Sequence, residues 1–237
     1  MASLFSISGQ AARVLCVVLI AAIILSLAGI EPSTSQSVGT IVPASPAGEI
    51  NSAGTRILIA GDSHASFAAA AATECAPQIV GAALPGATSM KFLGSLASLE
   101  AKSRFDAAYL MIGTNDALRK RRIGSEAFKE SANRIVDALA KVSSRIVVVA
   151  IPPIAAAQSN KFDPEKASAF SEVLHELCRA RSDCEFIDPH SAFRSSAALA
   201  AEAPGYLSAD GLHLSDYTAL NKELRVCAAP IPTAGLE

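Results

Sequence analysis

The 237-residue chain contains no tryptophan, few aromatic residues (5%) and no excess of charge of either sign. Its 20 basic and 22 acidic side chains give a formal net charge of −2. A nucleic-acid-binding domain would carry a strongly basic domain or face, so nucleic acid is not expected as a partner. The charged fraction is only 18% and the hydrophobic fraction is 51%, which excludes charge-rich disordered chains and leaves a globular composition.

Part of the hydrophobic excess lies in one uncharged run, residues 14–30, with Arg13 before it and Glu31 after it. This order is typical of a secretory signal peptide or a signal anchor. Seventeen helical residues span about 26 Å, slightly less than the hydrocarbon core of a bilayer, so length leaves both alternatives open. The small residues Ser26 and Ala28 permit cleavage after Ala28. We therefore expect residues 1–30 to direct export, to the periplasm or the extracellular side, with a membrane tether as one alternative.

Residues 31–55 are rich in Ser, Pro, Gly and Thr and show no helical or strand period. Such a composition predicts a flexible linker. The globular domain is then expected over residues 56–237, a length that can bury a substantial core.

The chain has five cysteines but no Cys-x-x-Cys pair, and its four histidines complete no recognisable ligand spacing. Neither a metal site nor a cofactor is therefore indicated. After export, cysteines outside the apolar run would meet an oxidising compartment, where disulfides persist. Cys178 and Cys184 are close enough to link a helix end to the next strand, and Cys75 with Cys227 is a second predicted pair. Free buried thiols are the alternative.

Short apolar runs alternate with helical patterns along the domain. Strands are predicted over residues 56–60, 78–83, 107–112, 145–150 and 184–187, and helices over residues 65–73, 89–101, 162–180 and 215–226, with a further helix before the fourth strand. Continuously apolar strands that alternate with helices favour a parallel sheet covered on both faces. The predicted fold class is therefore α/β, a doubly wound three-layer α/β/α sandwich.

Polar motifs follow the first three predicted strands, with Ser63, Gly86 and Asn115 at their carboxyl ends. Ligands of open parallel sheets bind outside these ends, which predicts a functional site there. A serine nucleophile needs a base, and the base needs an orienting partner. Asp210 and His213, three residues apart, supply both. The backbone amides of Ser63 and Gly86 and the side-chain amide of Asn115 are candidate oxyanion donors.

Each of these residues also has a structural interpretation. Ser63 alone could cap the helix that follows it, and His213 alone could be a structural histidine. Their joint occurrence with Asp210, Gly86 and Asn115 favours an acyl-transfer site.

Other polar residues near these motifs are given lesser roles. His64 is a rival base, but adjacent residues rarely reach nucleophile–base geometry, so it is interpreted as lining the site or lying on the surface. His175 and His190 are expected to be structural or on the surface. Asp62 and Asp116, with Gly113, are expected to support the turns that aim their neighbours.

Arg119, Lys120, Arg121 and Arg122 form the only dense basic run. The run could contact an anionic glycan or a lipid surface near the mouth of the site. A solvated loop or helix start is the commoner explanation.

Four motifs in order resemble the SGNH (GDSL-type) hydrolase superfamily. They are Gly61-Asp62-Ser63, Gly86, Gly113-Thr114-Asn115-Asp116 and Asp210-x-x-His213. The resemblance implies a flavodoxin-like five-stranded parallel sheet, a Ser-His-Asp triad without the Gly-x-Ser-x-Gly elbow, and no metal. His64 departs from the leucine of many members. Gly-Asp-Ser-His is similar to domains attached to membrane acyltransferases that modify envelope polysaccharides.

The sequence therefore predicts an exported serine esterase that hydrolyses carboxylic acyl esters, small or glycan-borne. An O-acyltransferase that modifies cell-envelope polysaccharide is the alternative enzyme. An inactive tethered binding module is the alternative from another class, although none of the residues such a module would lose is missing.

Overall fold

The computed structural model describes residues 55–73, 78–96, 104–193 and 205–227. Five strands form one parallel sheet in the order β2-β1-β3-β4-β5. The strands are β1 (Ile57–Gly61), β2 (Ile79–Ala83), β3 (Ala107–Met111), β4 (Ile146–Val149) and β5 (Cys184–Ile187). This order is the flavodoxin-like one, with its switch point between β1 and β3. The predicted fold class is confirmed.

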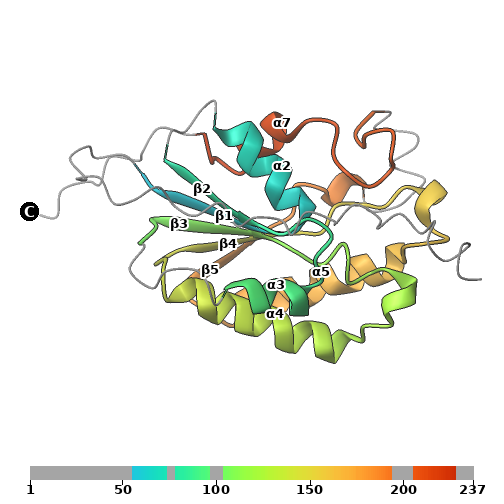
Figure 1. Cartoon of the computed structure of the whole chain (residues 1–237), viewed down its shortest axis with the longest axis horizontal. Helices are drawn as coiled ribbons and strands as arrows, with labels where there is room; N and C mark the ends of the chain where they lie inside the picture. The colour runs from blue at the N-terminus through green and yellow to red at the C-terminus, as the bar shows by residue number, and fades with distance from the viewer. Residues whose placement is uncertain (1–54, 74–77, 97–103, 194–204, 228–237) are drawn as a thin grey trace, which may run out of the picture. The chain divides into compact units, whose positions relative to one another are not determined.

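Helices cover both faces of the sheet (Figure 1). One face carries α2 (Ser63–Ala72) and α7 (Tyr217–Glu223), and the other carries α3 (Ser89–Leu96), α4 (Ser125–Ala140) and α5 (Pro164–Arg179). Three short 3₁₀ helices, η1 (Arg119–Arg121), η2 (Ala156–Gln158) and η3 (Ser191–Phe193), lie in the connections. The central strands β1, β3 and β4 are buried along their whole length, as expected of strands covered on both faces.

The apolar stripes of α4 and α5 meet beneath the sheet. Phe128 and Phe170 stack with ring centroids 4.2 Å apart, and neither ring is exposed. Truncating a buried phenylalanine to alanine costs about 3–5 kcal/mol, so this pair is a major part of the core on that face.

Three helices begin at an aspartate whose side chain caps the first turn. Asp62, Asp163 and Asp216 each accept a hydrogen bond from a backbone N–H of the first turn of α2, α5 and α7. Because Asp62 is the cap of α2, the interpretation of Ser63 as a helix cap is wrong. Ser63 is the first helical residue, and its hydroxyl remains available for another partner.

A disulfide joins Cys178 at the end of α5 to Cys184 in β5. This pair was predicted from the sequence and is confirmed. Cys227 is also disulfide-bonded. Cys75 lies outside the described residues, so the pairing of Cys75 with Cys227 stays a prediction.

The predicted signal or anchor segment, residues 1–30, and nearly all of the predicted linker, residues 31–55, lie outside the described residues. Within the part of the chain that is described, no helix has the length and apolar character needed to cross a membrane.

Candidate functional site

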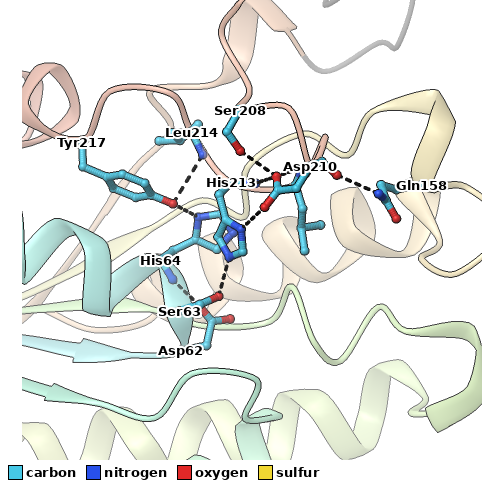
Figure 2. Close-up of polar contacts among 10 residues, drawn as sticks. Asp62, Ser63, His64, Gln158, Ser208, Asp210, His213, Leu214 and Tyr217 are labelled. Carbon is cyan, nitrogen blue, oxygen red and sulfur yellow. Dashed lines mark hydrogen bonds and ion pairs between the residues drawn. The ribbon is translucent and has the colours of Figure 1, made fainter.

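Ser63, His213 and Asp210 form a hydrogen-bonded series at the carboxyl edge of the sheet (Figure 2). The Oγ atom of Ser63 lies 2.8 Å from Nε2 of His213, and Nδ1 of His213 lies 2.6 Å from Oδ2 of Asp210. An ionised carboxylate only accepts hydrogen bonds, so Nδ1 of His213 carries the proton and donates to Asp210. Nε2 is then the acceptor for the Ser63 hydroxyl. The sequence placed Ser63 at this edge and predicted Asp210 and His213 as its partners from their spacing, and the structure brings the three into contact.

Asp210 lies in an exposed turn but is held by several donors. Its Oδ1 accepts from the hydroxyl of Ser208 at 2.7 Å and from the backbone N–H groups of Leu212 and His213 at 2.9 and 3.0 Å. Partial burial acts to raise the pKa of Asp210, but these hydrogen bonds and the one from the His213 side chain outweigh it. The pKa of Asp210 is therefore held well below its usual range, and the carboxylate stays ionised at neutral pH.

A second segment supports this turn from outside. The side-chain amide of Gln158, in η2, donates to the backbone carbonyl of Asp210 at 2.7 Å. The N–H of Ala155 donates to the carbonyl of Gly211 at 3.0 Å. These contacts could not be predicted from the sequence, because Gln158 and Asp210 are 52 residues apart.

Two glycines allow the turns after β1 and β3 to pack closely. Gly61 has φ +141°, and a Cβ atom there would lie 1.8 Å from the carbonyl oxygen of Met111. Gly113 has φ +122°, and a Cβ atom there would lie 2.4 Å from the side chain of Ile151. Both φ values are unfavourable for residues with a side chain. Glycine therefore lets the end of β1 approach the end of β3, and lets the turn after β3 approach the segment that follows β4.

Three candidate oxyanion donors occur near Ser63. Ser63 is the first residue of α2, where backbone N–H groups lack intrahelical partners. Gly86 is exposed with φ +74°, and none of the hydrogen bonds among the described residues uses its N–H. The side-chain amide of Asn115, 8% exposed, donates one hydrogen bond to Oδ2 of Asp62 at 3.4 Å. An amide nitrogen carries two protons, so one remains for a bound oxyanion.

Asp62 and Asp116 are buried carboxyl groups that hold the surrounding backbone. Oδ1 of Asp62 accepts from the N–H of His64 at 3.0 Å, and Asp116 accepts from the N–H and hydroxyl of Ser89. Burial raises the pKa of Asp62 to about 7, and the nearby charge of Asp116 acts in the same direction. Burial also raises the pKa of Asp116. Their contacts match the supporting role expected from the sequence.

His64 is 2% exposed, so the interpretation that places it on the surface is wrong. Its Nδ1 hydrogen-bonds the hydroxyl of Tyr217 at 2.8 Å, and its ring centroid lies 5.1 Å from that of His213 (Figure 2). Burial, followed by the nearby ring of His213, lowers the pKa of His64 to about 3, so His64 is neutral at pH 7. The Ser63 hydroxyl is bonded to His213, which leaves His64 as packing and support behind the base.

Tyr217 is the residue of this region that the sequence analysis missed. It links His64 to the segment after His213, because its hydroxyl also accepts from the N–H of Leu214 at 3.4 Å. Tyr217 occupies the first position of the last helix, which was predicted, but a tyrosine on an apolar helix face gives no sign of a partner 153 residues away.

The remaining histidines do not join the site. His175 lies on α5 with its ring next to Phe186, and its side chain is half exposed. His190 is buried, with Nδ1 2.6 Å from the hydroxyl of Tyr206. Both positions agree with the structural or surface roles expected for them. In the described parts of the chain, no group of three or more His, Cys, Asp or Glu side chains is placed to hold a metal ion.

Comparisons with known proteins identify the family of the chain. The sequence model of the GDSL-like Lipase/Acylhydrolase family matches residues 52–218. No curated protein sequence matches the chain.

Solved structures share the fold at low sequence identity. A protein from Streptococcus pneumonia, provisionally described as a platelet activating factor, is 22% identical with a TM-score of 0.61, over 75% of this chain and 86% of that one. A lipase/acylhydrolase from Enterococcus faecalis is 18% identical with a TM-score of 0.59, over 72% and 93%. An acetylxylan esterase from Geobacillus stearothermophilus is 16% identical with a TM-score of 0.55, over 76% and 94%.

The family match covers more than half of the chain and includes Ser63, Gly86, Asn115, Asp210 and His213. Together with the parallel five-stranded sheet and the polar series at its carboxyl edge, this match shows that the chain belongs to the GDSL-like lipase/acylhydrolase family, the SGNH hydrolases.

Proposed function

We propose that this protein is an esterase that hydrolyses carboxylic acyl esters with Ser63 as nucleophile, His213 as base and Asp210 as the residue that orients the base. The observation that carries the proposal is the pair of contacts on His213, 2.8 Å to Oγ of Ser63 and 2.6 Å to Asp210. A serine hydroxyl becomes a useful nucleophile when a positioned base removes its proton.

In the first half of the reaction, Oγ of Ser63 attacks the ester carbonyl carbon while Nε2 of His213 takes the hydroxyl proton. The negative charge that develops on the carbonyl oxygen would be stabilised by the N–H groups of Ser63 and Gly86 and the side-chain amide of Asn115. The C–O bond to the alcohol then breaks, and His213 returns its proton to the departing alkoxide. An acyl group remains bound to Ser63.

In the second half, water replaces the alcohol. His213 removes a proton from the water as its oxygen attacks the acyl carbon, and then returns a proton to Oγ of Ser63 as the acid leaves. Asp210, ionised because of its several donors, stabilises the imidazolium in both halves.

Short acyl groups on a small alcohol or a glycan are the favoured substrates. An acetylxylan esterase shares the fold. The ring of Phe67, 48% exposed, lies 5.0 Å from the ring of His213, so an exposed aromatic side chain is available next to the proposed base. An aromatic side chain at this position suits the apolar face of a sugar or of an aryl alcohol.

Export is part of the proposal, on the evidence of the apolar run at residues 14–30 and of a disulfide, which is typical of oxidising compartments. Cell fractionation of the expressing organism tests it. Recovery of the protein in the cytoplasm would contradict it.

The test of the activity uses the full chain, p-nitrophenyl esters of graded acyl length, and a fluorophosphonate probe. We expect release of p-nitrophenol, fastest with short acyl groups, and labelling of Ser63 that is lost in Ser63→Ala. Absence of hydrolysis and labelling in folded protein would favour the inactive binding module. Adding an excess of an oligosaccharide acceptor distinguishes the esterase from an O-acyltransferase. An O-acyltransferase would transfer most acyl groups to the sugar, and it would release little acid when the acceptor is absent.

A further inference from the structure

A cavity of about 590 Å³ opens between the segment that follows β3 and the segment between β4 and α5. Its walls include Arg119 from the first segment and Pro152, Pro153 and Ile154 from the second. Asp163, which caps α5, and Glu165 in its first turn also line it, so the positive charge near the cavity lies at its edge and beyond. This volume is within the range of small-molecule and cofactor sites.

The walls of this cavity continue the loops that carry the acyl-transfer residues. Arg119 comes four residues after Asn115. Ile154 and Ser159 flank the segment whose Ala155 N–H and Gln158 side chain donate to the carbonyls of Gly211 and Asp210. A group bound in the cavity would therefore lie beside the acyl-transfer site, within reach of a larger substrate.

Arg119 is fixed at the edge of the cavity. Its Nη1 pairs with Asp163 at 2.9 Å, and its Nε donates to the carbonyl of Ser159 at 2.9 Å. Guanidinium, carboxylate and hydroxyl groups in one hollow offer both donors and acceptors, which suits the hydroxyl groups of a sugar. The proline rings beside them supply apolar walls.

More positive charge stands next to Arg119. Lys120, Arg121 and Arg122 are exposed, and within the described residues none of them pairs with a carboxylate. The N–H of Arg119 donates to the carbonyl of Lys161 at 2.9 Å, which brings another exposed cation to the same place. We call Lys120, Arg121, Arg122 and Lys161 the basic rim. The chain as a whole carries −2, so this is a local concentration of positive charge.

We propose that the cavity and the basic rim bind the anionic glycan part of the substrate, so that the enzyme removes acyl groups carried on an acidic polysaccharide or oligosaccharide. This inference rests on the proposed esterase function. Concentrated charge of one sign beside a site raises the local concentration of ligands of the opposite sign.

A glycan fits these observations better than an anionic membrane surface. Binding to the surface of a bilayer combines cationic residues with apolar side chains that enter it. The large exposed apolar residues in the described part of the chain, Phe67 and Met90, lie on α2 and α3 instead of the rim. The rim adjoins Arg119, and Arg119 lines a hollow that can receive a chain of sugars.

Binding is tested without turnover, using the full-length Ser63→Ala variant and unesterified oligogalacturonate as the anionic probe. Calorimetric titration should show binding that weakens by about tenfold or more when ionic strength rises from about 20 to 200 mM, because salt screens exposed charges. The rim variant adds Lys120→Gln, Arg121→Gln and Arg122→Asn to its parent. It should bind oligogalacturonate at low salt about tenfold or more weakly than the parent does. Asparagine is chosen at Arg122 because φ is +52° there.

A matched control removes three exposed charges elsewhere, with Lys129→Gln, Arg134→Gln and Lys141→Gln on or just after α4. This variant has the same net charge as the rim variant and should bind oligogalacturonate like its parent. Equal weakening in both variants, or equal binding of neutral xylo-oligosaccharide, would overturn the inference. Capture by vesicles containing anionic phospholipid, with no binding of oligogalacturonate, would overturn it in favour of a membrane surface.

Turnover supplies the second measurement. The ratio of kcat/KM for acetylated oligogalacturonate to that for acetylated xylo-oligosaccharide should exceed one, and it should fall by about tenfold in the rim variant, mainly through KM. A ratio of one in the unmodified enzyme would overturn the inference. If folded enzyme binds oligogalacturonate with the expected salt dependence but hydrolyses no ester, the proposed activity fails and the glycan site stands.

Discussion

The proposed nucleophile, Ser63, and the proposed base, His213 with its partner Asp210, come from two very different regions of the molecule. Ser63 is the first residue of α2 and lies just after the fully buried strand β1. Its chain neighbours Asp62 and His64 are 0% and 2% exposed. The side chain of Asp210 is 49% exposed and lies in an irregular turn that only a few hydrogen bonds hold. The core therefore fixes the position of Ser63, whereas a surface turn and its contacts fix those of Asp210 and His213. We expect substitutions of the buried residues around Ser63, such as Asp62 and His64, to change stability, and substitutions in the exposed turn to change turnover alone.

Removing the nucleophile or the base should have the largest effect. Ser63→Ala and His213→Ala should each lower kcat by about 10⁴-fold or more, because a triad acts as a unit. The melting temperature of both variants should stay close to that of the parent, since neither side chain fills a core position. Steady-state kinetics with a p-nitrophenyl ester and thermal unfolding check this prediction. Persistent fluorophosphonate labelling of Ser63→Ala would show that another residue is the nucleophile.

Asn115 lies between the two regions and should show a smaller effect. Loss of one oxyanion donor lowers kcat by about 10²–10³-fold, so Asn115→Ala should fold and turn over slowly. The measurement is kcat and KM with the same ester. A change in KM alone would count against the role, because it would indicate loss of uniform binding instead of transition-state stabilisation.

The buried region should control how stability depends on pH, through two opposing groups. Folding raises the pKa of Asp62 from 3.8 to about 7, so the folded chain binds more protons than the unfolded one between these values. The free energy of unfolding therefore falls as pH rises through that window. Folding lowers the pKa of His64 from 6.5 to about 3, so the free energy of unfolding falls as pH drops below about 6.5. Between about pH 4 and 6.5 the two effects oppose each other.

Asp62→Asn and His64→Gln separate these contributions. In Asp62→Asn, stability should fall more steeply than in the parent as pH drops from 6.5 to 4.5, and in His64→Gln it should rise relative to the parent over the same change. The difference in slope should approach about 1.4 kcal/mol per pH unit. Denaturant titrations at both pH values measure it. Unfolding free energies that run parallel to the parent's at both pH values would show that neither carboxyl nor imidazole titrates as described.

The contact that supports the exposed turn should have the smallest effect. Gln158→Ala removes the donor to the carbonyl of Asp210 and should lower kcat about fivefold, about 1 kcal/mol, with an unchanged melting temperature. Gln158→Glu is an informative companion, because it keeps the side-chain size but removes the donor. If Gln158→Ala unfolds at a lower temperature and keeps full turnover, the distinction between the two regions fails.

Much of the site could be predicted because its parts are local in sequence. The turns after β1 and β3 carry their own glycines and aspartates, and Asp210 and His213 are three residues apart, so each motif is visible without the fold. The disulfide between Cys178 and Cys184 was predictable for the same reason, since the two cysteines are only six positions apart. Parallel strands all end at one edge, which then brings such motifs together.

The environment of His64 could not be predicted in this way. Its partner Tyr217 is 153 residues distant, and only the packing of α7 against α2 brings the two side chains together. The contacts of Gln158 with Asp210 and of Lys161 with Arg119 could not be predicted either. They depend on how the long connections pack at the edge of the sheet.

The sequence by itself determined the α/β class, the order of strands and helices, the cysteine pair and the choice of Ser63, Asp210 and His213 as candidate reacting residues. These follow from apolar periodicity, turn chemistry and short spacings, which act over a few residues. Only the tertiary structure decided that Ser63 follows a cap instead of being one, that His64 is buried next to His213, and that Arg119 lines a cavity. Side-chain burial and the partners of distant residues are properties of packed layers, and they exist only once the crossover connections have placed helices and loops against the sheet.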